Sequence, residues 1–241
     1  MNREYHKWFS TTLNRDMELL VFGHSGEPVI FFPTRTARFY DYENWRIVEA
    51  LSAKTANGEM QLFCVDSVDI ESFYSPVYPA ERIKRHQQYE QYILDEVIPF
   101  IKKNNNHASL TAAGCSLGGY HAVNIAFRHP QLFSKVVGMS ARYDLTLSTP
   151  SFANLFDGYF DENIYFNMPG MFIPNLNDED ILRNLKKMDI IIVIGREDPF
   201  FENNLHLVSA LTAKNITPSF YVWNEEAHRA KYWRKMVQLY L

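Results

Sequence analysis

The sequence of 241 residues has little cysteine, and its two cysteines, Cys64 and Cys115, both fall in apolar, strand-like stretches. Two such thiols cannot form a disulfide framework, and a free cysteine in an apolar stretch is usually a small core residue. No apolar run reaches the length of a membrane span, and the polar start, Met1 to His6, has no apolar run behind it to form a signal peptide. We therefore expect a reduced, cytoplasmic protein without a membrane partner.

An excess of positive charge and the spacing of a metal site are also missing. The formal net charge is −4, with 24 Lys and Arg against 28 Asp and Glu. Both signs are interspersed, which is typical of a solvated surface and argues against nucleic acid as a partner. Histidines and carboxylates show no metal-site spacing such as H-E-x-x-H, so we expect neither a metal nor an organic cofactor. No repeat or low-complexity linker divides the chain, and its length suits one α/β domain over residues 1–241.

Strand-like and helix-like stretches alternate along most of the chain. The segments 5–13 and 17–22 predict an antiparallel pair at the start. Apolar runs predict parallel strands at 29–32, 60–65, 109–113, 135–140, 189–194 and 218–223. Helical spacing predicts helices at 41–56, 81–103, 119–128, 201–214 and 230–241. Pro99 should bend the helix at 81–103. This pattern predicts an α/β fold with a mostly parallel sheet and helices on both faces.

The segment 143–187 departs from this alternation. It contains Pro150, Pro169 and Pro174, many Asn and Asp residues, and a high density of aromatic side chains. A long, irregular, aromatic-rich insertion after a late strand suits a cap beside an active site, and it equally suits a structural excursion. An exposed aromatic patch within it would instead provide a homodimer surface.

The pentapeptide Gly114-Cys115-Ser116-Leu117-Gly118 is the most informative stretch of the sequence. It has the pattern G-x-S-x-G, between a predicted strand and a predicted helix. That context is the nucleophile elbow of the α/β-hydrolase fold, in which a sharp turn pushes the serine hydroxyl out above the sheet. The glycines at 114 and 118 remove side chains that would collide in the turn. We therefore predict that Ser116 is a catalytic nucleophile.

A serine nucleophile needs a histidine base and an acid that orients it, and in this fold both follow the serine in chain order. The carboxyl ends of parallel strands, where such sheets carry their chemistry, supply a candidate for each. Asp198 lies in the loop after strand 189–194, and Asp144 and Glu197 compete with it for the role of acid. His228 follows the last predicted strand and is the candidate base. We interpret the histidines before it as surface or packing residues.

The oxyanion hole requires two backbone N–H donors. The first is expected from Leu117, which follows the nucleophile, and the second from Thr34 or Arg35 in the loop after strand 29–32, because Pro33 cannot donate. Arg35 and Arg38 either bind an anionic group or face solvent.

Several stretches together resemble one family. They are residues 113–120 (AGCSLGGY), 31–34 (FFPT), 38–40 (RFY), 62–67 (LFCVDS) and 156–160 (FDGYF). They are similar to the Putative esterase family of α/β-hydrolases, a group related to esterase D and enterobactin esterase. The resemblance covers nearly the whole chain and implies the α/β-hydrolase fold and the triad Ser116, Asp198 and His228. Two stretches depart from the family pattern: Arg229-Ala230-Lys231 follows His228 in place of Asp-Trp-Pro, and the loop 34–37 has no glycine.

From these residues we expect a serine hydrolase that cleaves a small-molecule carboxylic ester through an acyl-enzyme intermediate. Acyl transfer to an alcohol or thiol uses the same triad and is the alternative within enzymes. An α/β-hydrolase fold that only binds a ligand, without catalysis, is the alternative from another class.

Overall fold

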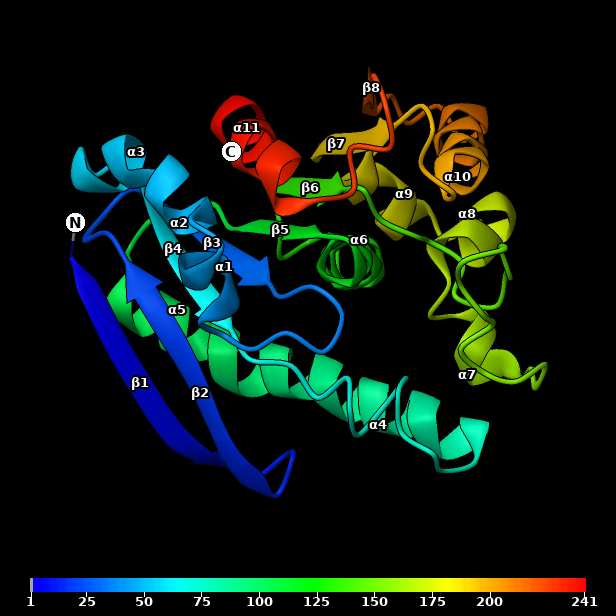
Figure 1. Ribbon diagram of the computed structural model, residues 1–241, viewed down its shortest axis with the longest axis horizontal. Coiled ribbons are helices and arrows are strands. Elements are labelled where there is room, and N and C mark those ends of the chain that lie inside the picture. Colours follow the sequence, from blue (N-terminus) through cyan, green and yellow to red (C-terminus); the bar gives the residue numbers. More distant parts are fainter. Residues whose placement is uncertain (1) are drawn as a thin grey trace.

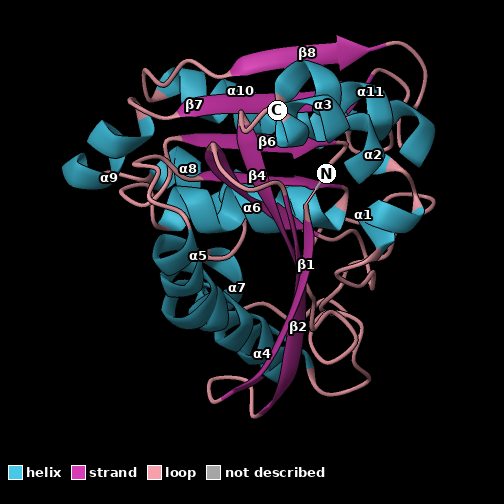
Figure 2. Cartoon of the chain, turned by 90° about the vertical axis from the view of Figure 1, so that its left-hand side faces the viewer, coloured by secondary structure: helices cyan, strands magenta, loops and turns pink. Residues whose placement is uncertain are grey.

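One eight-stranded sheet organises residues 2–241, the part of the chain that our computed structural model describes (Figure 1). The strands lie in the order β1-β2-β4-β3-β5-β6-β7-β8. Their bounds are β1 Arg3–Ser10, β2 Arg15–Phe22, β3 Glu27–Phe32, β4 Met60–Val65, β5 Thr111–Cys115, β6 Lys135–Met139, β7 Asp189–Gly195 and β8 Ser219–Trp223. β2 pairs antiparallel with β1 and with β4, and the other neighbours are parallel. The sheet twists strongly from the β1–β2 ribbon to β8 (Figure 2). Both the antiparallel start and the parallel remainder were predicted.

Helices cover both faces of this sheet. Their bounds are α1 Asp41–Asn44, α2 Ile47–Ala50, α3 Ser52–Ala56, α4 Pro79–Tyr92, the π-helical segment η1 Ile93–Val97, α5 Ile98–Asn104, α6 Leu117–Arg128, α7 Glu162–Tyr165, α8 Pro169–Asn175, α9 Glu179–Leu185, α10 Phe201–Ala213 and α11 Ala230–Tyr240. α2 and α11 lie on one side of the central strands, and α4, α5 and α6 lie on the other (Figure 1). Of the helices in residues 2–241, none combines the length and the apolar character that crossing a membrane requires.

Alternate residues of the strands divide the core into two layers, as the two-residue period of a strand requires. In β3, Ile30 and Phe32 belong to the layer beneath η1, α5, α6 and α10. Val29 and Phe31 belong to the layer beneath α1, α2 and α11. Because both faces are buried, the strand reads as the continuous apolar run from which it was predicted.

The single helix predicted at 41–56 is wrong, because the segment forms the three short helices α1, α2 and α3. Arg46 adopts a left-handed conformation at φ 59° and interrupts the helical hydrogen bonds. Tyr42 and Ile47 are both buried in the same apolar cluster. On an unbroken helix these two residues would point about 140° apart, since each residue turns the helix by about 100°. Packing on the sheet therefore overrides helical continuity here.

The long helix predicted at 81–103 is present as α4, η1 and α5 in succession. Its predicted apolar face is buried: Tyr89, Ile93, Val97 and Ile101 each expose 2% or less of their surface. The irregularity lies in the π-helical turn that ends two residues before Pro99. A π turn accommodates the missing backbone donor of a proline, so the predicted disturbance takes this form.

The segment 143–187 contributes α7, α8 and α9 between β6 and β7. Three of its apolar side chains, Phe156, Ile164 and Met168, are buried in a small cluster together with Leu117 and Tyr120 of α6. The rings of other members of the segment, Phe160 and Phe166, are exposed. The segment therefore packs on α6, the helix that follows Ser116, and it keeps apolar side chains on its outer surface.

Candidate active site

Ser116 lies in the sharp turn between β5 and α6, with backbone angles of φ 55° and ψ −125°. This conformation is strained for a residue with a side chain, and it persists because the surroundings leave no alternative. A Cβ atom on Gly114 would lie 2.2 Å from the backbone of Gly118, and one on Gly118 would lie 2.2 Å from the carbonyl oxygen of Phe32. The two glycines of the pentapeptide therefore let β3, β5 and α6 approach one another closely beneath the serine.

His228 and Asp198 complete a continuous chain of hydrogen bonds with Ser116. His228 Nε2 lies 2.9 Å from Ser116 Oγ, and His228 Nδ1 lies 2.8 Å from Asp198 Oδ2. The other carboxylate oxygen of Asp198 accepts a hydrogen bond from the Phe200 N–H, at 2.9 Å. The Asp198 side chain is fully buried, and that of His228 is 11% exposed. In this arrangement the imidazole donates from Nδ1 and presents its Nε2 lone pair to the serine hydroxyl.

The loops that carry His228 and Asp198 are hydrogen-bonded to each other. The Glu197 N–H donates to the Glu225 carbonyl at 3.1 Å, and Gly195 packs so closely on Glu226 that a Cβ atom would lie 2.0 Å from its carbonyl oxygen. His228 reaches the serine although Arg229-Ala230-Lys231 follows it. The two competitors for the acid lie elsewhere: Glu197 is exposed, and Asp144 accepts hydrogen bonds from Thr146.

The residues predicted for the oxyanion hole lie on the same cleft as Ser116. Leu117, Thr34 and Arg35 are all among its lining residues. Thr34 and Ala37 close a tight turn through the Ala37 N–H and the Thr34 carbonyl, at 3.0 Å. Thr36 within the turn has φ 54°, a conformation that favours glycine. The loop therefore makes the turn without the glycine that its family pattern carries there.

Asp69 stabilises this unusual turn from beneath. One of its carboxylate oxygens accepts the Thr36 N–H at 3.0 Å, and the other lies 3.1 Å from His121 Nε2 on α6. Asp69 is 1% exposed and His121 is 3% exposed. The carboxylate therefore joins the loop 34–37, called the oxyanion loop below, to the elbow helix α6. These are the two elements expected to supply the oxyanion donors. No motif in the sequence marks Asp69, because only the fold brings it to this loop.

Tyr42 joins the ends of β3 and β5 in a similar way. Its hydroxyl donates to the Phe32 carbonyl at 2.7 Å and accepts the Cys115 N–H at 2.9 Å. Burial raises the pKa of this phenol well above its usual value, so it remains protonated and able to donate. It fixes Cys115, the residue before Ser116, against the strand that leads into the loop 34–37.

Beside Ser116 the cleft has a volume of about 230 Å³, below the roughly 300–1,000 Å³ common for sites of drug-sized ligands. Most of its lining is apolar. The lining residues are Thr34, Arg35, Tyr74, Ser116, Leu117, Arg142, Leu145, Phe152, Leu155, Phe200, His228 and Trp233. The rings of Phe200 and Trp233 also pack near His228, at 6.0 and 5.7 Å between centroids. These rings shield the imidazole from water, which strengthens its hydrogen bonds.

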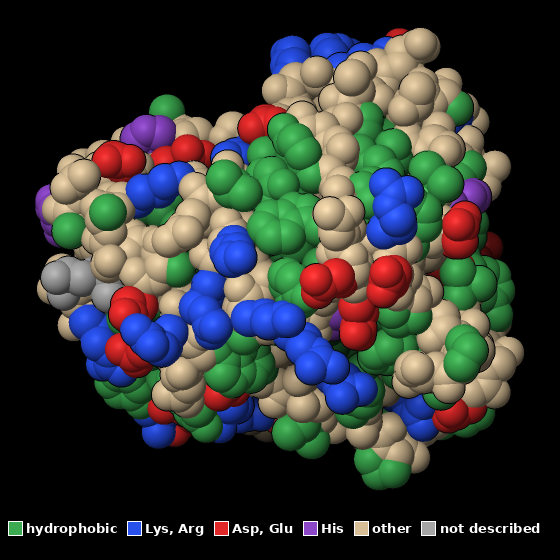
Figure 3. All heavy atoms as spheres, turned by 45° about the horizontal axis from the view of Figure 1, so that its top comes forward, with side chains coloured by type: hydrophobic (Ala, Val, Ile, Leu, Met, Phe, Trp, Pro, Cys, Tyr) green, Lys and Arg blue, Asp and Glu red, His purple; other side chains and the backbone are tan. Residues whose placement is uncertain are grey.

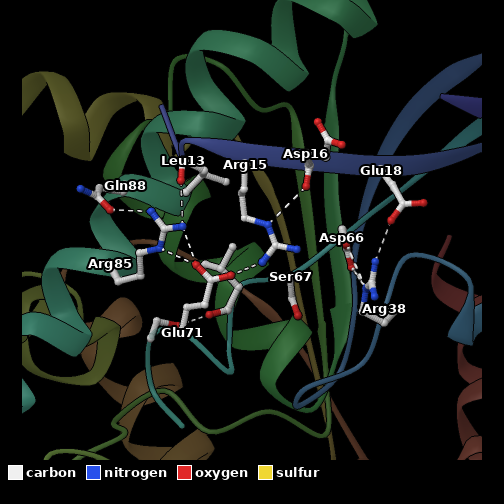
Figure 4. Close-up of polar contacts among 12 residues, drawn as sticks. Leu13, Arg15, Asp16, Glu18, Arg38, Asp66, Ser67, Glu71, Arg85 and Gln88 are labelled. Carbon is white, nitrogen blue, oxygen red and sulfur yellow. Dashed lines mark hydrogen bonds and ion pairs between the residues drawn. The ribbon is translucent and has the colours of Figure 1, made fainter. Parts of the chain in front are cut away.

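Arg38, one of the two arginines considered for anion binding, is occupied elsewhere. Its guanidinium pairs with Asp66 at 2.7 Å and with Glu18 at 2.8 Å (Figure 4). Asp66 is fully buried, and its burial raises the pKa of the carboxyl even though Arg38 lowers it. Arg38 therefore neutralises a buried acid, whereas Arg35 lines the cleft.

Several solved structures of similar fold are named as esterases or hydrolases. A ferulic acid esterase aligns with a TM-score of 0.78 at 19% identity, over 99% of this chain and 95% of that one. FphF, a fluorophosphonate-binding serine hydrolase of Staphylococcus aureus, aligns with a TM-score of 0.69 at 17% identity, over 99% and 96% of the two chains. An S-formylglutathione hydrolase of Agrobacterium tumefaciens aligns with a TM-score of 0.70 at 14% identity, over 98% and 91%. The protein therefore has the α/β-hydrolase fold, as predicted.

Residues 10–235 match the profile of the family described as "Putative esterase". The chain belongs to that family of esterases, which implies small-molecule ester substrates. Among curated proteins, none matches the sequence.

Proposed function

We propose that the protein hydrolyses a carboxylic ester with Ser116 as nucleophile, His228 as general base and Asp198 as the acid that orients the imidazole. The observation that carries this proposal is the unbroken series Ser116 Oγ–His228 Nε2 at 2.9 Å and His228 Nδ1–Asp198 Oδ2 at 2.8 Å. A serine hydroxyl is a weak nucleophile until a base within hydrogen-bond reach takes its proton.

In the first half of the reaction His228 takes the Ser116 proton while Oγ attacks the ester carbonyl carbon. The carbonyl oxygen acquires negative charge, which the N–H of Leu117 and the N–H of Thr34 or Arg35 stabilise. His228 then gives its proton to the departing alcohol oxygen, the ester C–O bond breaks, and the acyl group remains on Ser116.

In the second half His228 takes a proton from water as the water oxygen attacks the acyl-enzyme. Collapse of this second tetrahedral intermediate returns the proton to Ser116 Oγ and releases the carboxylic acid. Asp198 remains ionised throughout and stabilises the imidazolium that forms in each half. No step in this sequence calls on a metal or an organic cofactor.

We also infer that segment 143–187 acts as a cap. Leu145, Phe152 and Leu155 of this segment line the cleft directly beside the triad residues. A cap of this kind sets which acyl and alcohol groups enter, while the strand ends hold the reacting groups. The neighbouring hydrolases act on such different esters as ferulates and S-formylglutathione, and the segment is where we expect this chain to differ from them.

Intact-mass labelling with a fluorophosphonate probe tests the nucleophile. We expect one adduct on the wild-type protein and none on Ser116→Ala, and hydrolysis of short-chain para-nitrophenyl esters should be lost in the same variant. Labelling that persists in Ser116→Ala, or a folded wild type that neither takes the probe nor hydrolyses the esters, would refute the proposal.

A further inference from the structure

Among the described residues 2–241, the cleft beside Ser116 is lined by two arginines, Arg35 and Arg142, and by no aspartate or glutamate. The molecule as a whole, by contrast, carries a formal net charge of −4. On the face shown in Figure 3, basic and acidic side chains lie interspersed around exposed apolar ones. The acid of the proposed triad, Asp198, is fully buried behind His228, to which it is hydrogen-bonded. A ligand in the cleft therefore faces cationic side chains without facing a carboxylate.

Arg142 is a buried cation whose hydrogen-bond partners are all backbone carbonyls. Its guanidinium donates to the carbonyls of Asp144, Leu145, Leu147 and Ala153. Burial lowers the pKa of Arg142, yet an arginine remains protonated at any ordinary pH. Carbonyl dipoles compensate a buried charge only in part, because they carry no net charge of their own.

The acid nearest to Arg142 in sequence, Asp144, does not form an ion pair with it in the described part of the chain. One carboxylate oxygen of Asp144 accepts both the backbone N–H and the hydroxyl of Thr146. Asp144 therefore attracts the guanidinium of Arg142 without touching it, and the groups in direct contact with this charge are backbone carbonyls. In a site with apolar walls such a charge acts over a longer distance than it would in water.

Arg35 provides the second positive charge, in a more accessible place. Its guanidinium lies 5.9 Å from the centre of the Tyr74 ring, and both side chains line the cleft. Arg35 has no carboxylate within ion-pair distance among residues 2–241, whereas the next arginine, Arg38, binds two. The planar guanidinium of Arg35 is thus free to form paired hydrogen bonds with an oxyanion such as a carboxylate.

We propose that the preferred substrates are esters that carry a second, anionic oxygen group, of the carboxylate type, which Arg35 binds directly in the field of Arg142. The proposal rests on the ester hydrolysis proposed above and specifies its substrate class. The apolar side chains of the cleft, such as Leu145 and Phe152, would hold the remainder of a small acyl or alcohol group.

Matched pairs of esters test this preference, because a carboxamide has nearly the shape of a carboxylate without its charge. The acyl-side pair is the para-nitrophenyl monoester of adipic acid and the corresponding ester of adipamic acid. The alcohol-side pair is para-acetoxybenzoate and para-acetoxybenzamide. In at least one pair we expect kcat/KM to be about 10-fold higher for the anion at low salt, and to fall towards that of the amide as salt is added.

Variants of Arg35 test whether the Arg35 side chain causes the preference for anionic esters. Arg35→Gln should lower kcat/KM for the anion much more than kcat/KM for the amide, so that most of the anion-to-amide ratio is lost, and Arg35→Lys should restore part of the ratio. Arg46→Gln is the matched control, since Arg46 is an exposed arginine paired with Glu49 and lies away from the cleft. It removes one positive charge from the protein and should leave the ratio as it is.

Three results would overturn the proposal: equal kcat/KM within both pairs, a preference for the amides, or an equal loss on anion and amide in Arg35→Gln. The last would assign Arg35 to the oxyanion of the reaction instead of to the substrate. Calorimetric binding of adipate and adipamide to Ser116→Ala measures the same preference without turnover. A protein that binds adipate more tightly but hydrolyses no ester would retain the anion site and refute the proposed function alone.

Discussion

Replacing Asp69 with asparagine should impair catalysis although Asp69 lies outside the cleft lining. The carboxylate accepts one hydrogen bond from Thr36 and one from His121, at 3.0 and 3.1 Å. An asparagine supplies one carbonyl oxygen and one NH2 group, so it satisfies one of these donors and turns a donor towards the other. Either the oxyanion loop or the elbow helix then loses its link to the other.

The magnitude follows from two opposing terms at Thr36. Holding a residue with a side chain in the left-handed region costs about 1–2 kcal/mol. A hydrogen bond to a charged group contributes about 1.5–3 kcal/mol, which is enough to offset that cost. Without the carboxylate the balance reverses, and the loop relaxes away from φ 54°. Complete loss of one oxyanion donor reduces kcat by about 10²–10³-fold, so a displaced but intact donor should reduce it by about 10-fold.

Steady-state hydrolysis of para-nitrophenyl acetate measures the effect, and kcat should fall with little change in KM, because the donor acts on the transition state. Asp66→Asn is the matched control: Asp66 is also a buried carboxylate, but it binds Arg38 and does not touch Thr36. The control should lose stability in urea without losing kcat. A folded Asp69→Asn protein with wild-type kcat would refute the reasoning.

Three further predictions concern the triad, the elbow and a buried histidine. Asp198→Asn should lower kcat by about 10⁴-fold while the melting temperature stays close to that of the wild type, because the amide favours the wrong imidazole tautomer. Gly118→Ala puts a Cβ atom 2.2 Å from the Phe32 carbonyl and should cost about 1–3 kcal/mol in urea unfolding together with slower fluorophosphonate labelling. Gly170→Ala, where the nearest atom is 3.5 Å away, should leave the labelling rate unchanged. Burial lowers the pKa of His86 from 6.5 to about 3, so the stability it contributes is present above about pH 6.5 and is lost as the pH falls towards about 3. From about pH 7 to about pH 5, His86→Gln should therefore lose about 2 kcal/mol less stability in urea than the wild type, and equal losses would contradict this.

Much of the candidate site was predictable, because its residues lie in local motifs at the ends of strands, and the order of the strands in the sheet brings those ends together. Ser116 is identified by two glycines that the structure requires for close contacts within the elbow. Asp198 and His228 follow the last two strands, and parallel strands bring their carboxyl ends to one edge of the sheet. The ends of the parallel strands moved by at most two residues between prediction and structure, and each loop kept its place relative to the strand before it.

The parts that escaped prediction depend on contacts between residues far apart in the chain. Asp69 and Tyr42 act on elements that the sheet brings to them, and nothing in their local sequence indicates this. The three-part helix at 41–56 depends on the burial of Tyr42 and Ile47 against the same face of the sheet. Propensity and periodicity describe one segment at a time, so they predicted a single helix where packing required three.

The cleft lining comes from two parts of the fold. Loops at the strand ends carry the residues proposed for the reaction, and segment 143–187 supplies side chains proposed to contact the substrate. Ser116, Asp198 and His228, the residues of the proposed triad, follow strands whose positions are set by the sheet, and this fold is shared by sequences that are less than one fifth identical. Arg142 follows β6, and its guanidinium holds the carbonyls of residues 144, 145, 147 and 153 in the segment that supplies Leu145, Phe152 and Leu155 to the cleft lining. One buried cation thus both holds part of segment 143–187 in place and adds positive charge to the cleft lining. A change at Arg142 should alter substrate preference and the structure of segment 143–187 together, whereas a change at Arg35 should alter preference without altering that segment.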